Sequence, residues 1–103
     1  MQHFAGRGFQ PCTYILASRK YGTLYVGVTS SVARRVWEHR AGRVRGFTQR
    51  YGVKTLVHYE FHQTMFDAIR REKQIKEWKR LWKIELIESR NPEWCDLFEE
   101  LPF

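Results

Sequence analysis

The sequence predicts a single small α+β domain, with its elements in the order strand, strand, helix, strand, helix, helix. Three observations lead to this fold class. Two short runs rich in β-branched and aromatic residues stand near the N-terminus, capped amphipathic segments have the spacing of helices, and a third β-rich run lies between those helices. A chain of 103 residues is long enough for one domain and too short for two ordinary ones.

The first two strands are predicted to form a β-hairpin. Residues 12–18 and 23–28 are the two β-rich runs, and residues 19–22 between them have the composition of a turn. Successive residues of a strand face opposite sides of the sheet, so alternate residues of the second run should enter the core. These residues are Leu24, Val26 and Val28.

The hairpin register decides which side chains share a face. If Ser18 pairs with Thr23 across the loop, Tyr14 lies opposite Gly27 and shares a face with Tyr25. Glycine at that position leaves room for the ring of Tyr14. A slip of one residue would destroy this arrangement, so it depends on the turn.

The first helix is predicted at residues 31–41. Thr29 and Ser30 are able to cap its start, and Gly42 stops it. The residues predicted to form its buried stripe are Val32, Ala33, Val36 and Trp37. Residues 43–50 then form a basic loop.

The second half of the chain predicts a third strand and more helix. Residues 53–61 are the strand, and residues 64–67 resemble a capping box that opens a helix to about Trp78. Residues 81–88 continue as helix and are stopped by the Asn-Pro pair at 91–92. The sequence leaves open whether these segments form one helix or two.

The chain divides into a flexible leader (residues 1–11), a folded domain (residues 12–95) and a C-terminal tail (residues 96–103). The leader is rich in glycine and ends in proline. The tail mixes acidic and aromatic residues, a composition that allows it to pack back on the body.

Composition and charge restrict the function classes. Lys and Arg outnumber Asp and Glu by 18 to 11, and the net charge of +7 favours polyanionic partners such as nucleic acid. Cys12 and Cys95 have no CxxC partner and form neither a zinc signature nor a disulfide framework. No apolar run approaches the roughly 20 residues of a membrane span, and residues 1–10 lack a signal-peptide core. We therefore expect a cytoplasmic protein with no membrane partner.

A carboxylate falls where the long helix should be apolar. Ala68, Ile69 and Ile75 mark the predicted inward stripe, and Glu72 lies on that stripe at the i+3/i+4 spacing. A carboxylate in this position must be paired, exposed in a cleft or bound to a cation. For a helix considered alone, pairing with a neighbouring Lys or Arg is the simpler interpretation.

Arg35 and His39 lie four residues apart on the first helix, and therefore on one face. The fork of donors on arginine suits a phosphate, and histidine takes or donates a proton near neutral pH. Taken alone, a basic helix face usually meets only water, and tyrosines are ordinary strand residues. The combination of these residues is more specific than any of its parts.

The order and spacing of these residues resemble the GIY-YIG nuclease family. The first motif is Thr13-Tyr14-Ile15, and the second is Tyr25-Val26-Gly27. Further family positions are matched by Thr29, Arg35, His39, Gly42, Glu72 and Asn91. The resemblance covers about residues 12–95 and is closest to the short single-domain bacterial members. In the first motif a threonine replaces the glycine of the family, and only the tyrosine keeps the family role.

The resemblance implies a three-stranded antiparallel sheet flanked by helices, and hydrolysis of a phosphodiester with one Mg²⁺ or Mn²⁺ ion. Glu72 would hold the metal, with waters and substrate oxygens as the other ligands. Arg35 would bind the phosphate as its charge develops. Tyr25 is the candidate general base, with Tyr14 or His39 assisting, and the choice between Tyr25 and His39 as the base stays open.

A further set of residues is predicted to contact nucleic acid: Arg34, Arg43, Arg45, Phe47, Arg50, Lys54 and Asn91. The basic members would follow the backbone, and Phe47 would either stack on a base or fill the core. Asn91 also suits an ordinary helix stop.

The predicted function is a metal-dependent endonuclease that acts on DNA in repair or recombination, directed by branched or damaged structure rather than by sequence. The alternative is a module that binds DNA or RNA and cuts it little or not at all. Such a module has no need for Glu72, because a carboxylate without a metal would repel the phosphate backbone. The oligomeric state and the need for a partner protein that supplies targeting stay open.

Overall fold

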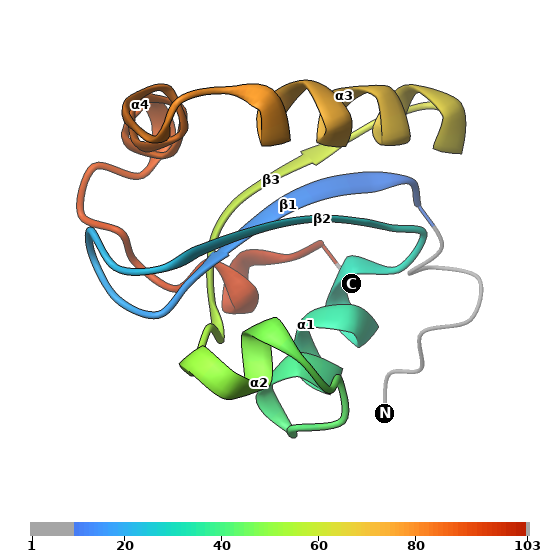
Figure 1. Cartoon of the computed structure of the whole chain (residues 1–103). Coiled ribbons are helices and arrows are strands. Elements are labelled where there is room, and N and C mark those ends of the chain that lie inside the picture. The colour runs from blue at the N-terminus through green and yellow to red at the C-terminus, as the bar shows by residue number, and fades with distance from the viewer. Residues whose placement is uncertain (1–9, 103) are drawn as a thin grey trace.

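The computed structural model describes residues 10–102, and it confirms the α+β class. The elements are β1 (Cys12–Ala17), β2 (Leu24–Thr29), α1 (Val32–Arg40), α2 (Phe47–Tyr51), β3 (Thr55–Phe61), α3 (Met65–Glu77), α4 (Arg80–Arg90) and the 3-10 turn η1 (Phe98–Glu100). The sheet is a middle layer with α3 and α4 on one side and α1 and α2 on the other (Figure 1). Most of the predicted leader, residues 1–11, lies outside the described residues.

β1 is the central strand of a three-stranded antiparallel sheet with the order β2-β1-β3. The predicted hairpin register is confirmed, because Ser18 N donates to Thr23 O over 3.0 Å and Tyr14 lies opposite Gly27. A Cβ atom at Gly27 would lie 2.5 Å from the hydroxyl oxygen of Tyr14, so glycine is required there. The register places Tyr14 and Tyr25 on one face, with ring centroids 6.3 Å apart.

Each face of the sheet has its own apolar cluster. The cluster beside α1 contains Cys12, Tyr14, Leu16, Val32, Ala33, Val36, Val53, Leu56 and Leu101. The cluster beside α3 and α4 contains Ile15, Ala17, Val26, Val57, Ile75, Ile87 and Trp94. Alternate residues of β1 therefore serve opposite faces. The prediction that Leu24, Val26 and Val28 enter the core holds fully only for Val26, because β2 is an edge strand and leaves the other two half-buried.

α1 lies close to its predicted position, but its buried stripe differs. Val32, Ala33 and Val36 are buried as predicted. Trp37 is 44% exposed and lies against the guanidinium of Arg43, 4.9 Å from its ring centroid. The prediction for Trp37 is wrong because His39, three residues after Val36, completes the inward stripe.

The caps of α1 also differ in part from the prediction. Ser31, rather than Thr29 or Ser30, is the N-cap, and its side chain makes no capping bond. Thr29 Oγ1 accepts from Ser31 N over 3.0 Å and supports the preceding turn. At the other end Gly42 adopts a φ of 73° and stops the helix, as predicted.

Residues 43–50, predicted as a loop, contain most of the five-residue helix α2. Gly46 precedes this helix with a φ of 103°, and Gly52 ends it with a φ of 64°. A helix of little more than one turn leaves no periodic pattern of apolar residues in the sequence. The prediction of a loop was wrong for this reason.

α3 and α4 are two separate helices, which answers a question that the sequence left open. Trp78 and Lys79 between them have extended backbone, with ψ of 151° and 157°. Thr64 is the N-cap of α3, and its Oγ1 accepts from Asp67 N over 3.1 Å, which is one of the two bonds of the predicted capping box. Across the described part of the chain, every helix is too short or too polar to cross a membrane.

The inward stripe of α3 consists of Ala68, Glu72 and Ile75. Ile69, predicted to belong to it, is 38% exposed. That prediction was wrong because Ile69 lies about 100° around the helix from Ala68, away from the sheet. Glu72 does lie on the stripe, and it is 8% exposed.

The C-terminal segment packs back on the body and covers the outer edge of β3. Leu97 N donates to Leu56 O over 2.8 Å, and Leu101 is buried in the cluster beside α1. Pairing at this edge satisfies backbone groups that an edge strand would otherwise offer to another chain.

Candidate active site

Tyr14, Tyr25 and His39 meet on the side of the sheet that faces α1. Tyr14 comes from β1, Tyr25 from β2 and His39 from the last turn of α1. The ring centroid of His39 lies 6.2 Å from that of Tyr14 and 5.6 Å from that of Tyr25. The hairpin register and the position of α1 thus bring three predicted residues into one cluster.

A chain of hydrogen bonds runs through this cluster. Tyr14 Oη lies 3.3 Å from His39 Nε2, and His39 Nδ1 lies 2.8 Å from Thr48 Oγ1. The guanidinium of Arg35, one turn before His39, lies close enough to the hydroxyl of Tyr14 to act on its pKa. One direction of donation satisfies the ring nitrogens of His39: Tyr14 donates to Nε2, and Nδ1–H donates to Thr48.

Burial sets the protonation state of this chain. It raises the pKa of Tyr14 well above the ordinary value of 10.0; Tyr25 adds to the effect and Arg35 opposes it. Burial and then the charge of Arg35 lower the pKa of His39 below 6.5. Both rings are therefore neutral at pH 7, as the hydrogen-bond chain requires.

Arg35 is the charged member of the cluster and reaches solvent. Its side chain is 39% exposed, and Nη1 donates to Glu38 Oε1 over 3.2 Å. Burial lowers the pKa of Arg35, but the hydrogen bonds to Glu38 and Tyr14 outweigh it and raise the pKa. An exposed pair of this kind contributes little, and a guanidinium has five donors, so Arg35 keeps donors for a phosphate.

Tyr25 continues outward into a row of exposed aromatic rings. Phe47 stacks on Tyr25 with a centroid distance of 6.4 Å, and Tyr51 lies 4.9 Å from Phe47. Phe47 is 48% exposed and Tyr51 is 51% exposed, so Phe47 does not fill the core. An open cavity of about 560 Å³ beside this row is lined by Gly46, Phe47, Gln49, Arg50 and Tyr51.

Thr48 and Tyr51 are site residues that the sequence analysis missed, because both lie on α2. This helix turns Thr48 inward to His39 and leaves Phe47 and Tyr51 outside. The sequence signal for α2 is a pair of glycines on either side of its five residues. Gly46 and Gly52 both have positive φ.

The predicted basic contacts are exposed on α1, on α2 and in the segments beside them. They are Arg34, Arg43, Arg45, Arg50 and Lys54. Arg50 lies against the ring of Tyr51, 5.8 Å from its centroid, so one cation is part of the aromatic row. These residues combine positive charge with stacking surface on the side of the molecule that holds the tyrosine cluster.

Asn91 lies elsewhere and is used inside the protein. It is 5% exposed; its Nδ2 donates to Val57 O over 3.1 Å and to Cys95 O over 2.9 Å. Its Oδ1 accepts from Cys95 N over 2.9 Å. Val57 lies where β3 shifts register against β1, so its carbonyl takes a partner outside the sheet. Asn91 fastens the C-terminal segment to β3.

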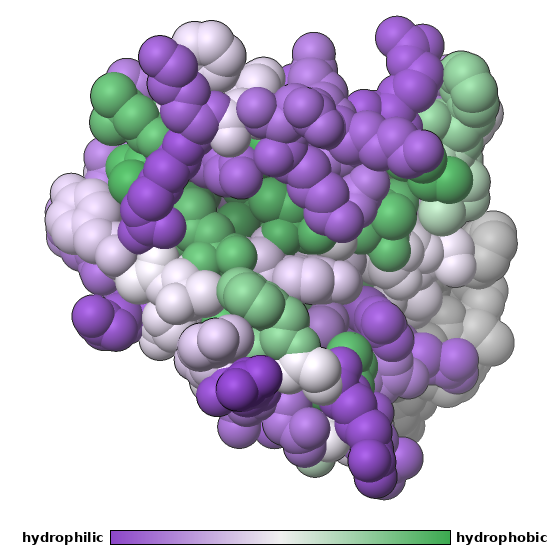
Figure 2. All heavy atoms as spheres, viewed as in Figure 1, coloured by the Kyte–Doolittle hydropathy of each residue, from purple (hydrophilic) through white to green (hydrophobic). Residues whose placement is uncertain are grey.

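Glu72 lies on α3, in the layer on the opposite side of the sheet from the tyrosine cluster (Figure 1). Its carboxylate is paired with Lys76 one turn along the helix. Within residues 10–102 no three His, Cys, Asp or Glu side chains are grouped to hold a metal ion. Hydrophilic side chains gather over the layer of α3 and α4, as Figure 2 shows.

The fold and the cluster define a class, that of small α+β domains whose polar cluster is built on a β-hairpin and the helix that follows it. The family model of the GIY-YIG catalytic domain matches residues 10–85. The chain belongs to the GIY-YIG family, a family of endonucleases that act on nucleic acid.

Several relatives are UPF0213 proteins. That of Staphylococcus haemolyticus is 35% identical over 71 residues, covering 69% of this chain and 87% of the relative. That of Halobacterium salinarum is 42% identical over 62 residues, covering 60% of this chain and 80% of the relative. The solution NMR structure of the UPF0213 protein from Bacillus halodurans is similar with a TM-score of 0.54 and 27% identity, covering 90% of this chain and 97% of that chain. These similarities confirm the predicted family and fold.

Proposed function

We propose that this protein is a metal-dependent endonuclease that hydrolyses DNA phosphodiester bonds, with low sequence specificity and a preference set by DNA structure. The observation that carries the proposal is the hydrogen-bond chain from Tyr14 through His39 to Thr48, with Arg35 and Tyr25 at its open side. A domain that only binds DNA needs positive charge but no buried Tyr–His pair. Branched, nicked or damaged DNA would be the substrate, and repair or recombination the setting.

Tyr25 is the proposed general base, and His39 acts through Tyr14. His39 is 2% exposed and both of its ring nitrogens are engaged, so it makes no direct contact with a substrate. Tyr25 is half-buried beside the exposed ring of Phe47, which leaves it accessible from solvent. Arg35, which lies near the hydroxyl of the neighbouring Tyr14, places positive charge on this side of the cluster.

In the proposed reaction a water oxygen attacks the phosphorus, and the water proton passes to the phenolate oxygen of Tyr25. The bond between phosphorus and the leaving sugar oxygen breaks. Arg35 binds the non-bridging oxygens and stabilises their charge. Tyr14 stays protonated and holds Arg35 and His39 in place. A divalent ion, when bound, would supply further charge neutralisation at the phosphate and the leaving oxygen.

Glu72 is the proposed metal ligand, with Mg²⁺ or Mn²⁺ as the ion. A single carboxylate suits Mg²⁺, which keeps several waters and takes phosphate oxygens as ligands. A nearly buried carboxylate on an otherwise apolar stripe fits this use, since such a group requires a cation. Lys76 supplies that cation in the structure, so a metal must displace it. α3 packs on β2, the edge strand that carries Tyr25, so the two layers share this edge.

The exposed basic and aromatic residues would hold the DNA. Arg34, Arg43, Arg45, Arg50 and Lys54 would contact phosphates, which gives affinity without sequence information. Phe47 would stack on a base beside Tyr25. Asn91 has no part in this surface, because its amide is bonded inside the protein.

The test is cleavage of supercoiled plasmid and of branched DNA in Mg²⁺, Mn²⁺ or EDTA. Glu72→Gln is compared with Glu77→Gln, which removes an exposed carboxylate from the same helix. We expect metal-dependent nicking by the wild type and by Glu77→Gln, and its loss in Glu72→Gln. Equal residual cleavage by the wild type and Glu72→Gln would indicate a contaminating nuclease and contradict the proposed site.

A nucleic-acid-binding module with little cleavage is the second candidate. It is favoured by one observation, the ion pair that already satisfies Glu72 in a layer apart from the tyrosine cluster. Such a module would bind DNA or RNA with steep salt dependence and show no metal-dependent cleavage of any substrate. Salt-sensitive binding without cleavage, with structured RNA included among the substrates, would favour this candidate over the nuclease.

A further inference from the structure

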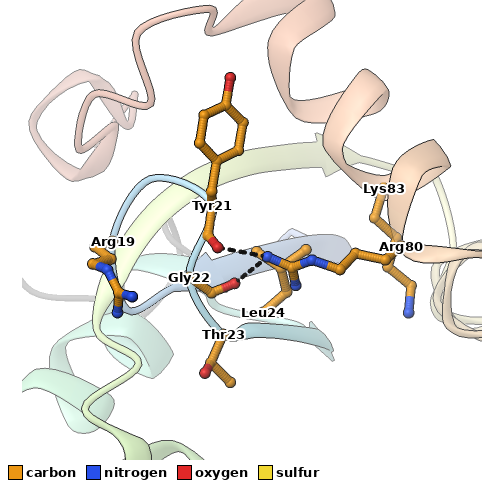
Figure 3. Close-up of a pocket in the computed structure, with 7 residues that line it drawn as sticks. All are labelled: Arg19, Tyr21, Gly22, Thr23, Leu24, Arg80 and Lys83. Atoms are coloured by element: carbon orange, nitrogen blue, oxygen red, sulfur yellow. Dashed lines mark hydrogen bonds between the residues drawn. The ribbon is translucent and has the colours of Figure 1, made fainter.

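A second basic site lies between the β1–β2 turn and α4. An open cavity of about 460 Å³ there is lined by Arg19, Tyr21, Gly22, Thr23, Leu24, Arg80 and Lys83 (Figure 3). Three of these residues are cations and none is an acid. The proposed function above makes no use of any of them.

Arg80 is held in a fixed position by the turn. Its Nη2 donates to both Tyr21 O and Gly22 O, each over 2.7 Å (Figure 3). Tyr21 adopts a φ of 62°, which is unusual for a residue other than glycine, and the two consecutive carbonyls both face Arg80. Carbonyl oxygens carry no net charge, so these bonds orient the guanidinium and leave its charge and its other donors available.

The charge in this cavity has no acidic counterpart. In the described chain, residues 10–102, none of Arg19, Arg80 and Lys83 forms an ion pair. Arg80 and Lys83 lie in the first turn of α4, which contains no acidic residue and has no side-chain cap. The positive end of a helix favours anions and disfavours cations, so two cations here repel the helix end unless an anion joins them.

The cavity lies close to the tyrosine cluster along β2. Figure 3 shows the side chains of Thr23 and Lys83 pointing to the same side, while the ring of Tyr21 points away. Thr23 directly precedes β2 and lies two residues before Tyr25, so an extended backbone places the two about 7 Å apart. This distance is of the order of the spacing between neighbouring phosphates of one strand, so a phosphate next to the scissile one would fit the cavity.

We propose that this cavity binds a second backbone phosphate of the nucleic acid whose scissile phosphate lies at Tyr25. Arg80 and Lys83 provide the charge, Arg19 closes the other side, and the hydroxyl of Thr23 provides a further donor. The identity of the ligand rests on the proposed function. The contact with the second phosphate would fix the position along the strand at which the site acts. Two fixed phosphate contacts align the strand over Tyr25 without any base recognition.

The first test measures DNA binding in EDTA, where no cleavage occurs, as a function of salt. The variant Arg19→Ala/Lys83→Ala is compared with Arg70→Ala/Lys73→Ala, which removes the same charge from the exposed side of α3. Arg80 is left intact because it holds the turn. Loss of one phosphate contact should lower the slope of log Kobs against log salt by about 0.9 and weaken binding about eightfold at 0.1 M salt. The control should change both values much less.

The second test is independent of DNA cleavage. Inorganic phosphate is titrated into ¹⁵N-labelled protein, and we expect saturable shifts of the Gly22, Thr23 and Lys83 amides that are absent in Arg19→Ala/Lys83→Ala. Saturable shifts without DNA cleavage would contradict the proposed function and leave the phosphate site standing. Two results would overturn the phosphate site alone in a protein that cleaves DNA. One is equal DNA affinity of the pocket and control variants, and the other is amide shifts that do not saturate with phosphate.

Discussion

On the α1 side of the sheet, the open face, polar side chains form a chain of hydrogen bonds that reaches solvent. On the α3 side, the closed face, polar side chains are bonded to one another. The first arrangement runs inward from Tyr14 through His39 to Thr48, with Tyr25 beside Tyr14 at the open side. In the second, both carboxylate oxygens of Glu60 are occupied. Arg71 Nε donates to Oε1 over 2.8 Å, and Oε2 lies 2.8 Å from His58 Nε2. One face leaves groups available to a ligand, and the other uses them to hold β3 to α3.

The protonation states of the two faces differ in the same way. Burial alone would raise the pKa of Glu60, but the bonds from His58 and Arg71 outweigh it and lower the pKa to about 2. At Tyr14 and His39 burial is the largest effect, and it keeps both rings neutral. The difference shows how this domain separates stability from chemistry: the charged Glu60 is fully paired on one face, and the neutral rings of Tyr14 and His39 lie on the other.

Tyr25→Phe should have the largest effect on the function of the open face. Loss of the general base should lower the rate of nicking by roughly 10²- to 10⁴-fold, with folding unchanged. Tyr59→Phe is the matched control, because the Tyr59 hydroxyl donates to Glu100 over 2.9 Å on another strand. Single-turnover cleavage of plasmid measures both. Similar losses in the two variants would mean that Tyr25 has no special role in the reaction.

Glu60→Gln should break the closed face. The substitution removes the negative charge and one of the two acceptor oxygens that Arg71 and His58 share. A pKa held near 2 rather than 4.5 corresponds to about 3 kcal/mol of stability. This contribution is present above pH 4.5, and it is lost as the pH falls towards 2, because the unfolded carboxylate then binds the proton first. Urea unfolding between pH 2 and pH 7 measures it, and Glu60→Gln should lack that pH dependence.

The control for Glu60→Gln is Glu77→Gln, which changes an exposed carboxylate on α3. Its free energy of unfolding should change by less than about 0.5 kcal/mol. Cleavage per folded molecule should remain at the wild-type level in both variants. A large loss of cleavage in folded Glu60→Gln would contradict the separation of the two faces.

The positions of Tyr14, Tyr25, Arg35 and His39 could be predicted from the sequence because each depends on local rules. The turn fixes the hairpin register, and helix spacing places Arg35 beside His39. The same rules put Glu72 on the inward stripe of α3. They do not say which layer α3 occupies relative to the tyrosines, because that depends on how distant elements cross the sheet.

Other features depend on contacts that no sequence pattern reveals. α2 is bounded by two glycines with positive φ and has no periodic pattern, so Thr48 and the outward position of Phe47 could not be predicted from periodicity. The bonds of Asn91 depend on a register shift in β3 that only the folded sheet contains. The exposure of Trp37 was also mispredicted, because a polar residue, His39, takes the buried position that composition assigned to an aromatic one.

Thr48→Val should weaken the open face by a smaller amount than Tyr25→Phe. The variant keeps the shape of the side chain but removes the oxygen 2.8 Å from His39 Nδ1. A lost hydrogen bond of about 1 kcal/mol predicts a decrease of about fivefold in kcat with KM unchanged, since Thr48 positions His39 and does not contact the substrate. Thr48→Ser should restore kcat. A change in KM alone would place Thr48 in substrate binding instead.

Lys76→Met should have the smallest effect. It tests whether Glu72, which lies on the closed face, takes part in the chemistry of the open face. Lys76 is 51% exposed, so its pair with Glu72 is of the kind that contributes at most about 1 kcal/mol. If Glu72 holds the metal, removing its competitor should tighten Mn²⁺ binding by up to about fivefold, measured by calorimetry. If neither Lys76→Met nor Glu72→Gln changes the Mn²⁺ affinity, the Glu72–Lys76 pair belongs to the closed, structural face.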